Sequence, residues 1–222
     1  MELPLFPLKN VVLFPGMMLP LHIFEPRYRE MINRRVDEKL SFGVLLIDEG
    51  HEVGQGATPH KVGTAARITR VERLEGGRMN VATVGTERFR VQQLNYQRSY
   101  LTGEVEPYPV TNGSTRRAEE IAELVRPRVA EYMELVAKAN NLSPKPIRLP
   151  EDPTLLAFLI GMAMQVPCKK KQEILALPGI PEMLACEHAL LGREILLTRY
   201  MVETQAEVAA MTMGPTGYIF PN

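Results

Sequence analysis

The sequence changes character at one place, and this change constrains the fold more than any other feature. Up to about residue 106, short runs of Val, Ile, Leu and Phe are separated by proline and glycine, a pattern typical of strands joined by turns. Pro107–Pro109 and Thr111–Ser114 form a linker, and from Arg116 apolar residues recur every three or four positions, as in amphipathic helices. We therefore predict an α+β chain with a mostly β part, residues 1–110, a helical part, residues 116–212, and an apolar tail, residues 213–222, which folds back or docks into a partner.

The β part contains eight segments with the composition of strands. They are Leu3–Leu8, Val11–Phe14, Met17–Ile23, Phe42–Ile47, Val62–Leu74, Met79–Val84, Arg88–Leu94 and Leu101–Glu106. Two glycines in Glu75–Arg78 predict a tight hairpin turn, and a change of parity near Thr69–Arg70 predicts a bulge. Alternation puts Phe89 in the core and Arg88 and Arg90 on the opposite face.

Proline and apolar spacing place the helices. One helix interrupts the β part from Pro26 to the Asp37–Lys39 region. In the second part, a helix runs from Arg116 to about Asn140, and we expect Pro127 to kink or divide it. Three further helices are predicted at Thr154–Val166 after an Asp152–Pro153 cap, at Lys169–Leu177, and from Pro181 through Leu184, Leu191, Ile195 and Val202. Together these helices make a small bundle.

Charge and cysteine content narrow the class of protein. Twenty-six basic residues balance 26 acidic ones, so the overall charge predicts no polyanionic partner, although eight basic and three acidic residues lie between Lys61 and Arg98. Two cysteines and a start without a signal peptide favour a reducing, cytoplasmic compartment. The longest uncharged apolar run, Thr154–Val166, is shorter than the roughly 20 residues that a membrane-spanning helix needs, so no membrane partner is expected.

The segment Leu3–Tyr28, LPLFPLKNVVLFPGMMLPLHIFEPRY, resembles the opening of the Lon protease amino-terminal domain family. Phe42–Val44, Val62–Ile68, Arg88–Val91 and Asp152–Pro153 agree with that family in order and spacing. The resemblance implies a PUA-like pseudo-β-barrel followed by a small α-helical bundle, the part of Lon that contacts protein substrates and holds no catalytic residues. Because the family's ATPase module would begin where this chain ends, we expect it to act alone, without the ATPase and Ser-Lys peptidase modules.

Motifs that would carry chemistry are absent or incomplete in the sequence. No phosphate-binding loop of the form GxxxxGK[ST] occurs. Gly54–Pro59 begins like a dinucleotide fingerprint, but Pro59 replaces the third glycine and a strand follows, so a mobile loop with His51 and His60 is the alternative that we favour. We therefore predict no nucleotide and no other cofactor.

Metal and nucleophile sites are not predicted either. Cys186 and His188 are two positions apart, which puts them on different faces of a helix, so a buried cysteine and a core or interface histidine are expected. Cys168 precedes Lys169–Lys171, where the ammonium groups would lower a thiol pKa, but a solvated charge run beside a partly buried thiol is the simpler interpretation. None of the four serines lies in a recognisable catalytic motif.

His22, Glu25, Arg27 and Tyr28 bring an acid, a base and a cation into one short stretch. A structural role explains them more simply, because Glu25 precedes a helix start, where a carboxylate favourably faces exposed backbone N–H groups. We keep contact with a ligand or partner as the alternative for these four residues. With Arg67, Arg88 and Arg90 of the basic region they form the set of candidate contacts.

Three classes of function remain open from the sequence. The first is a non-catalytic protein that binds unfolded or partner polypeptides through a groove between barrel and bundle or through an apolar patch, helped by the methionine pairs at 17/18, 162/164 and 211/213. The second is an RNA-binding module using the basic region 61–98, against which stands the lack of an aromatic residue for base stacking between 67 and 88. The third is an enzyme of unknown type. The partner's identity, the action of a separate protease, the oligomeric state and a small-molecule site between barrel and bundle stay open.

Overall fold

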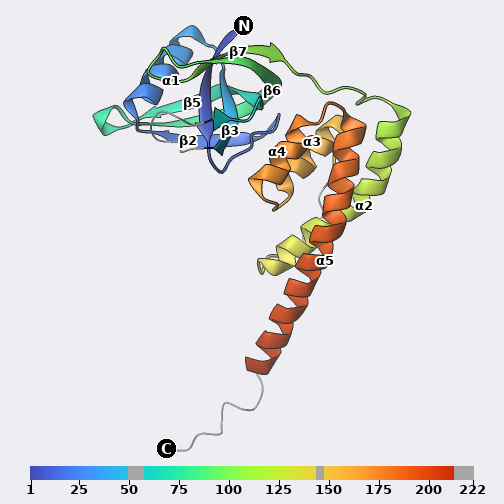
Figure 1. The fold of residues 1–222 in the computed structure, drawn as a ribbon. Helices are drawn as coiled ribbons and strands as arrows, with labels where there is room; N and C mark the ends of the chain where they lie inside the picture. Colours follow the sequence, from blue (N-terminus) through green and yellow to red (C-terminus); the bar gives the residue numbers. More distant parts are fainter. Residues whose placement is uncertain (50–57, 144–147, 213–222) are drawn as a thin grey trace, which may run out of the picture.

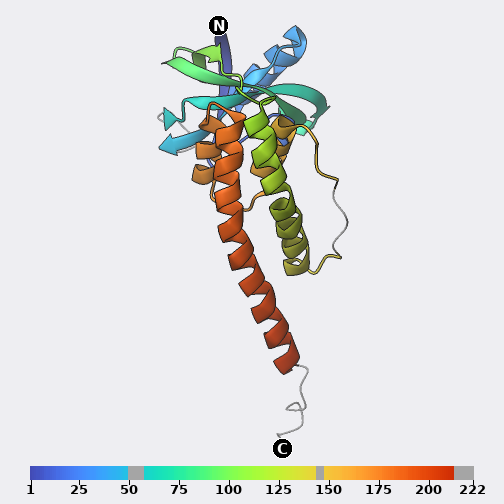
Figure 2. The same cartoon turned by 90° about the vertical axis from the view of Figure 1, so that its right-hand side faces the viewer.

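A computed structural model describes residues 1–49, 58–143 and 148–212. Its strands lie at one end of the molecule and most of its helices beside them (Figures 1 and 2). The strands are β1 (Glu2–Leu8), β2 (Met18–Ile23), β3 (Phe42–Glu49), β4 (Thr58–Pro59), β5 (Val62–Arg73), β6 (Met79–Asn95) and β7 (Thr102–Pro107). The helices are α1 (Pro26–Glu38), α2 (Arg116–Ala139), α3 (Pro153–Ala163), α4 (Cys168–Ala176), α5 (Ile180–Thr212) and the short 3₁₀ turn η1 (Glu75–Gly77). The predicted tail, residues 213–222, and most of the glycine-rich segment 54–59 lie outside the described residues.

The strands close into a ring. β1 pairs with β7 on one side and, in parallel, with β3 on the other, and β7, β6, β5 and β3 complete the circuit. β2 attaches to the first half of β6. This arrangement, followed by the helices, confirms the predicted α+β architecture of a barrel and a bundle.

The hairpin of β5 and β6 follows the sequence closely. Gly76 and Gly77 have φ angles of 69° and 73°, the left-handed region that favours glycine, and the strands they join pair antiparallel from Arg73 and Met79 onwards. The register shifts between Ile68 and Arg70, which confirms the predicted bulge. The prediction of two separate strands after the hairpin was wrong, because β6 runs unbroken through Gly85 to Asn95.

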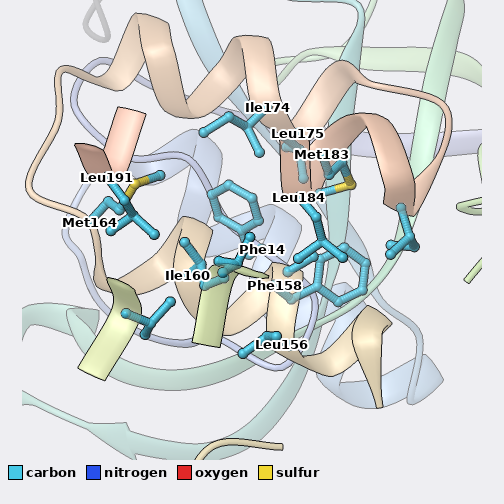
Figure 3. Packing of buried hydrophobic residues seen from close by; sticks show 14 of the residues in the cluster. Phe14, Leu156, Phe158, Ile160, Met164, Ile174, Leu175, Met183, Leu184 and Leu191 are labelled. Atoms are coloured by element: carbon cyan, nitrogen blue, oxygen red, sulfur yellow. The ribbon is translucent and has the colours of Figure 1, made fainter. Parts of the chain in front are cut away.

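Val11–Phe14 was predicted as a strand, and the structure shows this to be wrong. The segment alternates as a strand would, but it joins no ladder because its side chains anchor it between the two parts of the molecule. Leu13 lies in the barrel core, whereas Val12 and Phe14 lie in the core of the helical bundle. Figure 3 shows the Phe14 ring among Ile160, Leu184 and their neighbours. The backbone of Phe14 passes close to Gly85, where an added Cβ would lie 2.3 Å from the Phe14 carbonyl oxygen.

The helices begin where their caps predict. Pro26 and Pro153 occupy first-turn positions, and the Asp152 carboxylate accepts hydrogen bonds from the backbone N–H groups of Thr154 and Leu155 at 2.6 and 3.2 Å. α2 is one continuous helix, so Pro127 does not divide it. α3 ends at Ala163, short of the predicted Val166, because Met164 is extended and Pro167 disfavours helical backbone before it.

The bundle core joins α2, α3, α4 and α5. Leu156, Ile160, Leu184 and Leu191 are almost completely buried there (Figure 3). α2 and α5 pack along each other, and α5 continues beyond the end of α2 (Figures 1 and 2). The bundle therefore holds the first half of α5 in a core, and the second half projects from it.

Candidate functional site

A shallow groove of about 370 Å³ lies between the barrel and the bundle. The barrel supplies Pro15, Thr86, Glu87 and part of Arg88, the linker supplies Pro107–Val110, and α3 supplies Phe158. Prolines, Tyr108, Val110 and Phe158 make its surface mainly apolar, with Glu87 exposed beside it. We call this hollow the barrel–bundle groove; a groove at this place was one of two binding surfaces that the sequence left open, and an apolar patch was the other.

Arg88 fixes one wall of the groove. The Arg88 Nη1 donates hydrogen bonds to the carbonyl oxygens of Leu175 and Leu177, at 2.6 and 2.7 Å, at the carboxyl end of α4. Tyr108 adds a third bond, from its hydroxyl to the Ala176 carbonyl oxygen at 3.0 Å. A cation suits this helix end, where unpaired carbonyls carry partial negative charge.

Alternation placed Arg88 on the face of β6 opposite Phe89, and the structure shows that this face is not open to solvent at Arg88. Arg88 is only 3% exposed, because α4 covers that face of β6. Burial lowers the pKa of Arg88 to about 10, so the guanidinium remains charged at neutral pH. Phe89 is buried on the other face, as predicted. A sequence pattern gives the two faces of a strand, but it does not show that a helix from the second part will cover one of them.

Arg90 is the half-buried neighbour of Arg88 on the same face. Its guanidinium carbon lies 4.0 Å from the centroid of the Tyr108 ring, and that of Arg88 lies 4.6 Å from the same ring. Both cations therefore hold Tyr108 in place by cation–π contact. Tyr108 in turn forms part of the groove, so two candidate residues act on the groove through one aromatic ring.

Glu25, Arg27 and Tyr28 belong to the start of α1. Tyr28 is 5% exposed, and its ring centroid lies 4.2 Å from that of Phe6, so it is part of the barrel core. Arg27 lies over the Tyr28 ring at 4.5 Å and pairs with Glu25 at 2.9 Å. The Glu25 side chain makes no capping hydrogen bond to the backbone N–H groups of the first turn. The ion pair with Arg27 takes its place.

His22 lies on the outer face of β2, apart from the groove residues. Its Nδ1 is 2.8 Å from the Asn80 Oδ1, and the Asn80 Nδ2 donates to the Glu72 Oε2 at 3.2 Å. These three side chains and Arg70, with apolar residues of β2 and β6, border a hollow of about 390 Å³ on the barrel surface. The four candidates from residue 22 to 28 are thus divided between the surface and the core, and the structure does not assemble them into one site.

The basic residues between Lys61 and Arg98 do not form one surface. Arg67 and Arg70 are exposed on β5, but Arg88 is buried under α4. Arg73 donates to the Asn33 side chain at 2.9 Å, and Arg98 lies 3.6 Å from the Glu2 carboxylate. The local excess of positive charge in the sequence is therefore distributed over separate parts of the barrel.

Glu187 is an unexpected feature that the sequence analysis missed. It is fully buried in the bundle, and neither carboxylate oxygen has a hydrogen-bond partner among the described residues. Burial raises its pKa well above the ordinary value of 4.5, so the carboxyl is kept in its neutral form. His188, expected in the core or an interface, is half-buried, and burial and Arg128 lower its pKa. The sequence did contain a signal for this burial, because helical spacing places position 187 beside Leu184 and Leu191.

No cluster of three or more His, Cys, Asp or Glu side chains suited to a metal ion occurs within residues 1–49, 58–143 and 148–212. Within the same ranges, no helix is both long enough and apolar enough to span a bilayer.

Comparisons with known proteins agree with one another. The family model described as the ATP-dependent protease La (LON) substrate-binding domain matches residues 2–193. A Lon protease of Flavobacterium johnsoniae is 28% identical over 188 residues, and one of Trichlorobacter lovleyi is 29% identical over 218. These alignments cover 82% and 93% of this chain but only 22% and 25% of the relatives, so the chain spans about a quarter of their length or less.

Two solved structures share the fold. A Lon N-terminal domain protein from Xanthomonas campestris has a TM-score of 0.62 and 23% identity, with 83% of this chain and 95% of that chain covered. The N-terminal domain of a Mycobacterium avium complex Lon protease has a TM-score of 0.64 and 18% identity, with 86% and 98% covered. At these identities the likeness concerns the fold.

Proposed function

Because the chain belongs to the family of Lon substrate-binding domains, we propose that it is a non-catalytic recognition module that binds unfolded or partner polypeptides in the barrel–bundle groove. The observation that carries this proposal is the apolar lining of the groove, formed by residues from both parts of the chain. An exposed apolar hollow between two rigid bodies is a common place for ligands to bind.

The shape and rigidity of the groove favour an extended apolar segment as its ligand. Prolines at 15, 107 and 109 limit the motion of its walls, so little conformational entropy is lost when a ligand binds. The bonds from Arg88 and Tyr108 to α4 hold barrel and bundle together beside it. Two of the seven candidate residues support the binding surface: Arg88, which also lines the groove, and Arg90 both hold the Tyr108 ring by cation–π contact.

Binding of a permanently unfolded model protein, reduced and alkylated and carrying a fluorescent label, tests the proposal. We expect fluorescence anisotropy to show binding of the unfolded form and none of the native form. Val110→Lys places a charge in the groove, and Pro109→Lys changes its exposed edge; each should weaken binding at least about tenfold, because an apolar ligand would have to desolvate an ammonium group.

Leu40→Lys is the matched control. Leu40 is a 52% exposed apolar residue after α1, away from the groove, so the same charge there should leave binding unchanged. Thermal melting must show that each variant is folded. Equal binding by the wild type, Val110→Lys and Pro109→Lys, all folded, would place the ligand elsewhere, and no binding by the wild type would contradict the function itself.

RNA binding is the second candidate, and the exposed positions of Arg67 and Arg70 favour it. Contacts to phosphate release counterions, so RNA affinity through these residues should fall steeply with salt, and Arg67→Glu with Arg70→Glu should reduce that slope. Binding of a labelled single-stranded RNA across a salt series measures both effects. The expected cytoplasmic location stays a prediction.

A further inference from the structure

The second half of α5 carries an apolar stripe that is exposed in the part of the chain that the structure describes. Leu197, Met201 and Val208 are 51%, 55% and 56% exposed, and Tyr200 beside them is 69% exposed. Tyr200, Met201 and Val208, together with Thr204 and Gln205, border a shallow apolar hollow along the helix. We call this stripe the α5 stripe; it begins beside α2, where Arg199 pairs with Glu131, and runs along the second half of α5, which continues past α2 (Figures 1 and 2).

The α5 stripe has the spacing of a helix–helix seam. Leu197, Met201, Thr204 and Val208 follow one another at intervals of four, three and four residues, which keeps them on one side of a helix. Leu184, Leu191 and Ile195, which face the bundle core, lie about a third of a turn away around the same helix. The stripe is therefore a second apolar face and does not extend the bundle core.

An isolated helix with an exposed apolar face gains little stability in water, because most helical stability in proteins comes from packing that face. A second copy of this chain is the occupant that the charges favour. Arg193 and Glu207 are both exposed, lie on the same side of the stripe, and are each seven residues, about two turns, from Tyr200. An antiparallel copy centred near Tyr200 brings Arg193 of each chain opposite Glu207 of the other.

The same charges disfavour the parallel arrangement. In a parallel pair in register, Arg193 would lie beside Thr198 of the second copy, and Glu207 would face no basic residue. In the antiparallel pair centred near Tyr200, Met201 of one chain packs on Met201 of the other and Leu197 packs near Thr204, and the two-fold axis repeats every contact. Opposite charges at both ends then fix the register.

We propose that two copies of this chain pair through the α5 stripe, with their α5 helices antiparallel and Arg193 of each beside Glu207 of the other. The contact is separate from the barrel–bundle groove, so it leaves the groove open in both copies. It does not depend on the proposed function.

Sedimentation equilibrium of the whole chain over a wide range of concentrations tests the pairing. We expect a monomer–dimer equilibrium for the wild type and only monomer for Met201→Glu, because the two-fold axis places two buried carboxylates at the centre of the contact. Circular dichroism should show that this variant keeps its fold, since Met201 is 55% exposed. A wild type that stays monomeric throughout would overturn the proposal.

Charge reversal tests the orientation. Glu207→Arg and Arg193→Glu each replace two attractive pairs by two repulsive ones, so each should raise the dimer dissociation constant about tenfold. The double variant restores opposite charges in the antiparallel pair and should regain the wild-type value. Arg117→Glu, an exposed arginine of α2, is the matched control and should change nothing. A dimer insensitive to both single reversals, or a double variant no better than either, would overturn the antiparallel arrangement.

Discussion

At the scale of single residues, Arg88 and Glu187 show two ways of burying an ionisable group. Arg88 gives two hydrogen bonds to the end of α4 through Nη1, whereas neither oxygen of Glu187 has a partner among the described residues. A buried polar group with no partner costs free energy, so Glu187 lowers the stability of the bundle. Arg88, by contrast, satisfies carbonyls that the helix end leaves unpaired.

Glu187→Met should stabilise the protein. The raised pKa of Glu187 means that both states hold the proton below about pH 4.5, and that the unfolded state alone releases it as the pH rises. The free energy of unfolding of the wild type therefore falls with pH above 4.5, until the pH passes the folded-state pKa. We expect a gain of about 1–3 kcal/mol at pH 8 and a smaller gain at pH 5.

Urea unfolding of wild type and Glu187→Met at both pH values measures the effect. Glu104→Met changes an exposed carboxylate of β7 and should show no such pH-dependent gain. An equal change at the two pH values would mean that Glu187 does not titrate differently in the folded state.

Residue roles were the least predictable part of this protein. The sequence identified Arg88 and Tyr28 as noteworthy but did not show that one would lie under α4 and the other beside Phe6. Both positions depend on contacts between segments far apart in the chain, and periodicity reports only on neighbours along one element. Glu187 was missed although its helical position beside Leu184 and Leu191 indicated burial.

At the scale of elements, local signals predicted more. The caps at Pro26 and Asp152, the glycine hairpin and the bulge after Ile68 depend on backbone preferences within a few residues, and all were confirmed. The prediction of a strand at Val11–Phe14 was wrong because its alternating side chains pack into two different cores and its backbone pairs with no strand. The type of an element is therefore predictable where its cause is local. The barrel–bundle groove was not predictable in this way, because its walls depend on contacts between distant segments.

Arg88→Met should loosen the contact of α4 with the barrel. It leaves the carbonyl oxygens of Leu175 and Leu177 without their donor in a buried place, which costs about 2 kcal/mol of unfolding free energy. Arg90→Met removes a neighbouring guanidinium that also lies on Tyr108 but is half-buried, so its cost should stay below about 1 kcal/mol. Chemical denaturation measures both; similar costs for the two variants would contradict the role given to Arg88.

Gly161→Ala should show how closely α3 packs on the Val11–Phe14 segment. A Cβ at position 161 would lie 2.5 Å from the Phe14 ring, so the helix or the ring must shift. We expect a loss of about 1–3 kcal/mol, although alanine has the higher helix propensity. Ala163→Gly, also in α3, should cost about 1 kcal/mol through helix propensity alone. Thermal melting of each variant with and without Phe14→Leu distinguishes the two causes. Phe14→Leu relieves the clash and should therefore reduce the loss caused by Gly161→Ala but not the loss caused by Ala163→Gly.

At the scale of the whole molecule, the barrel and the bundle are joined by more than their linker. Phe14 enters the bundle, Arg88 and Tyr108 bind the end of α4, and the Gln172 side chain donates to the Val62 carbonyl oxygen at 2.9 Å. These contacts bring together residues about 70 to 150 positions apart in the sequence. They position the walls of the barrel–bundle groove relative to each other.

Phe14→Ala should separate the unfolding of the two parts. Loss of a fully buried ring costs about 3–5 kcal/mol of unfolding free energy. Most of this free energy would come from the contact between bundle and barrel. Calorimetry should show one transition for the wild type and two for the variant. Leu156→Ala, which truncates a buried side chain inside the bundle and leaves Phe14 in place, should lower stability but keep a single transition. A single, merely lower transition for Phe14→Ala would mean that the other contacts suffice for coupling.

The division of the Val11–Phe14 segment between two cores also determines how this protein can be cut. A fragment of residues 1–110 would keep every strand but would leave Val12 and Phe14 without the helices that cover them. Such a fragment would present a fresh apolar surface to water and should precipitate or adhere to other proteins. A barrel fragment that is truncated at the linker would therefore bind other proteins non-specifically through this new apolar surface. Binding studies need the barrel and the bundle together.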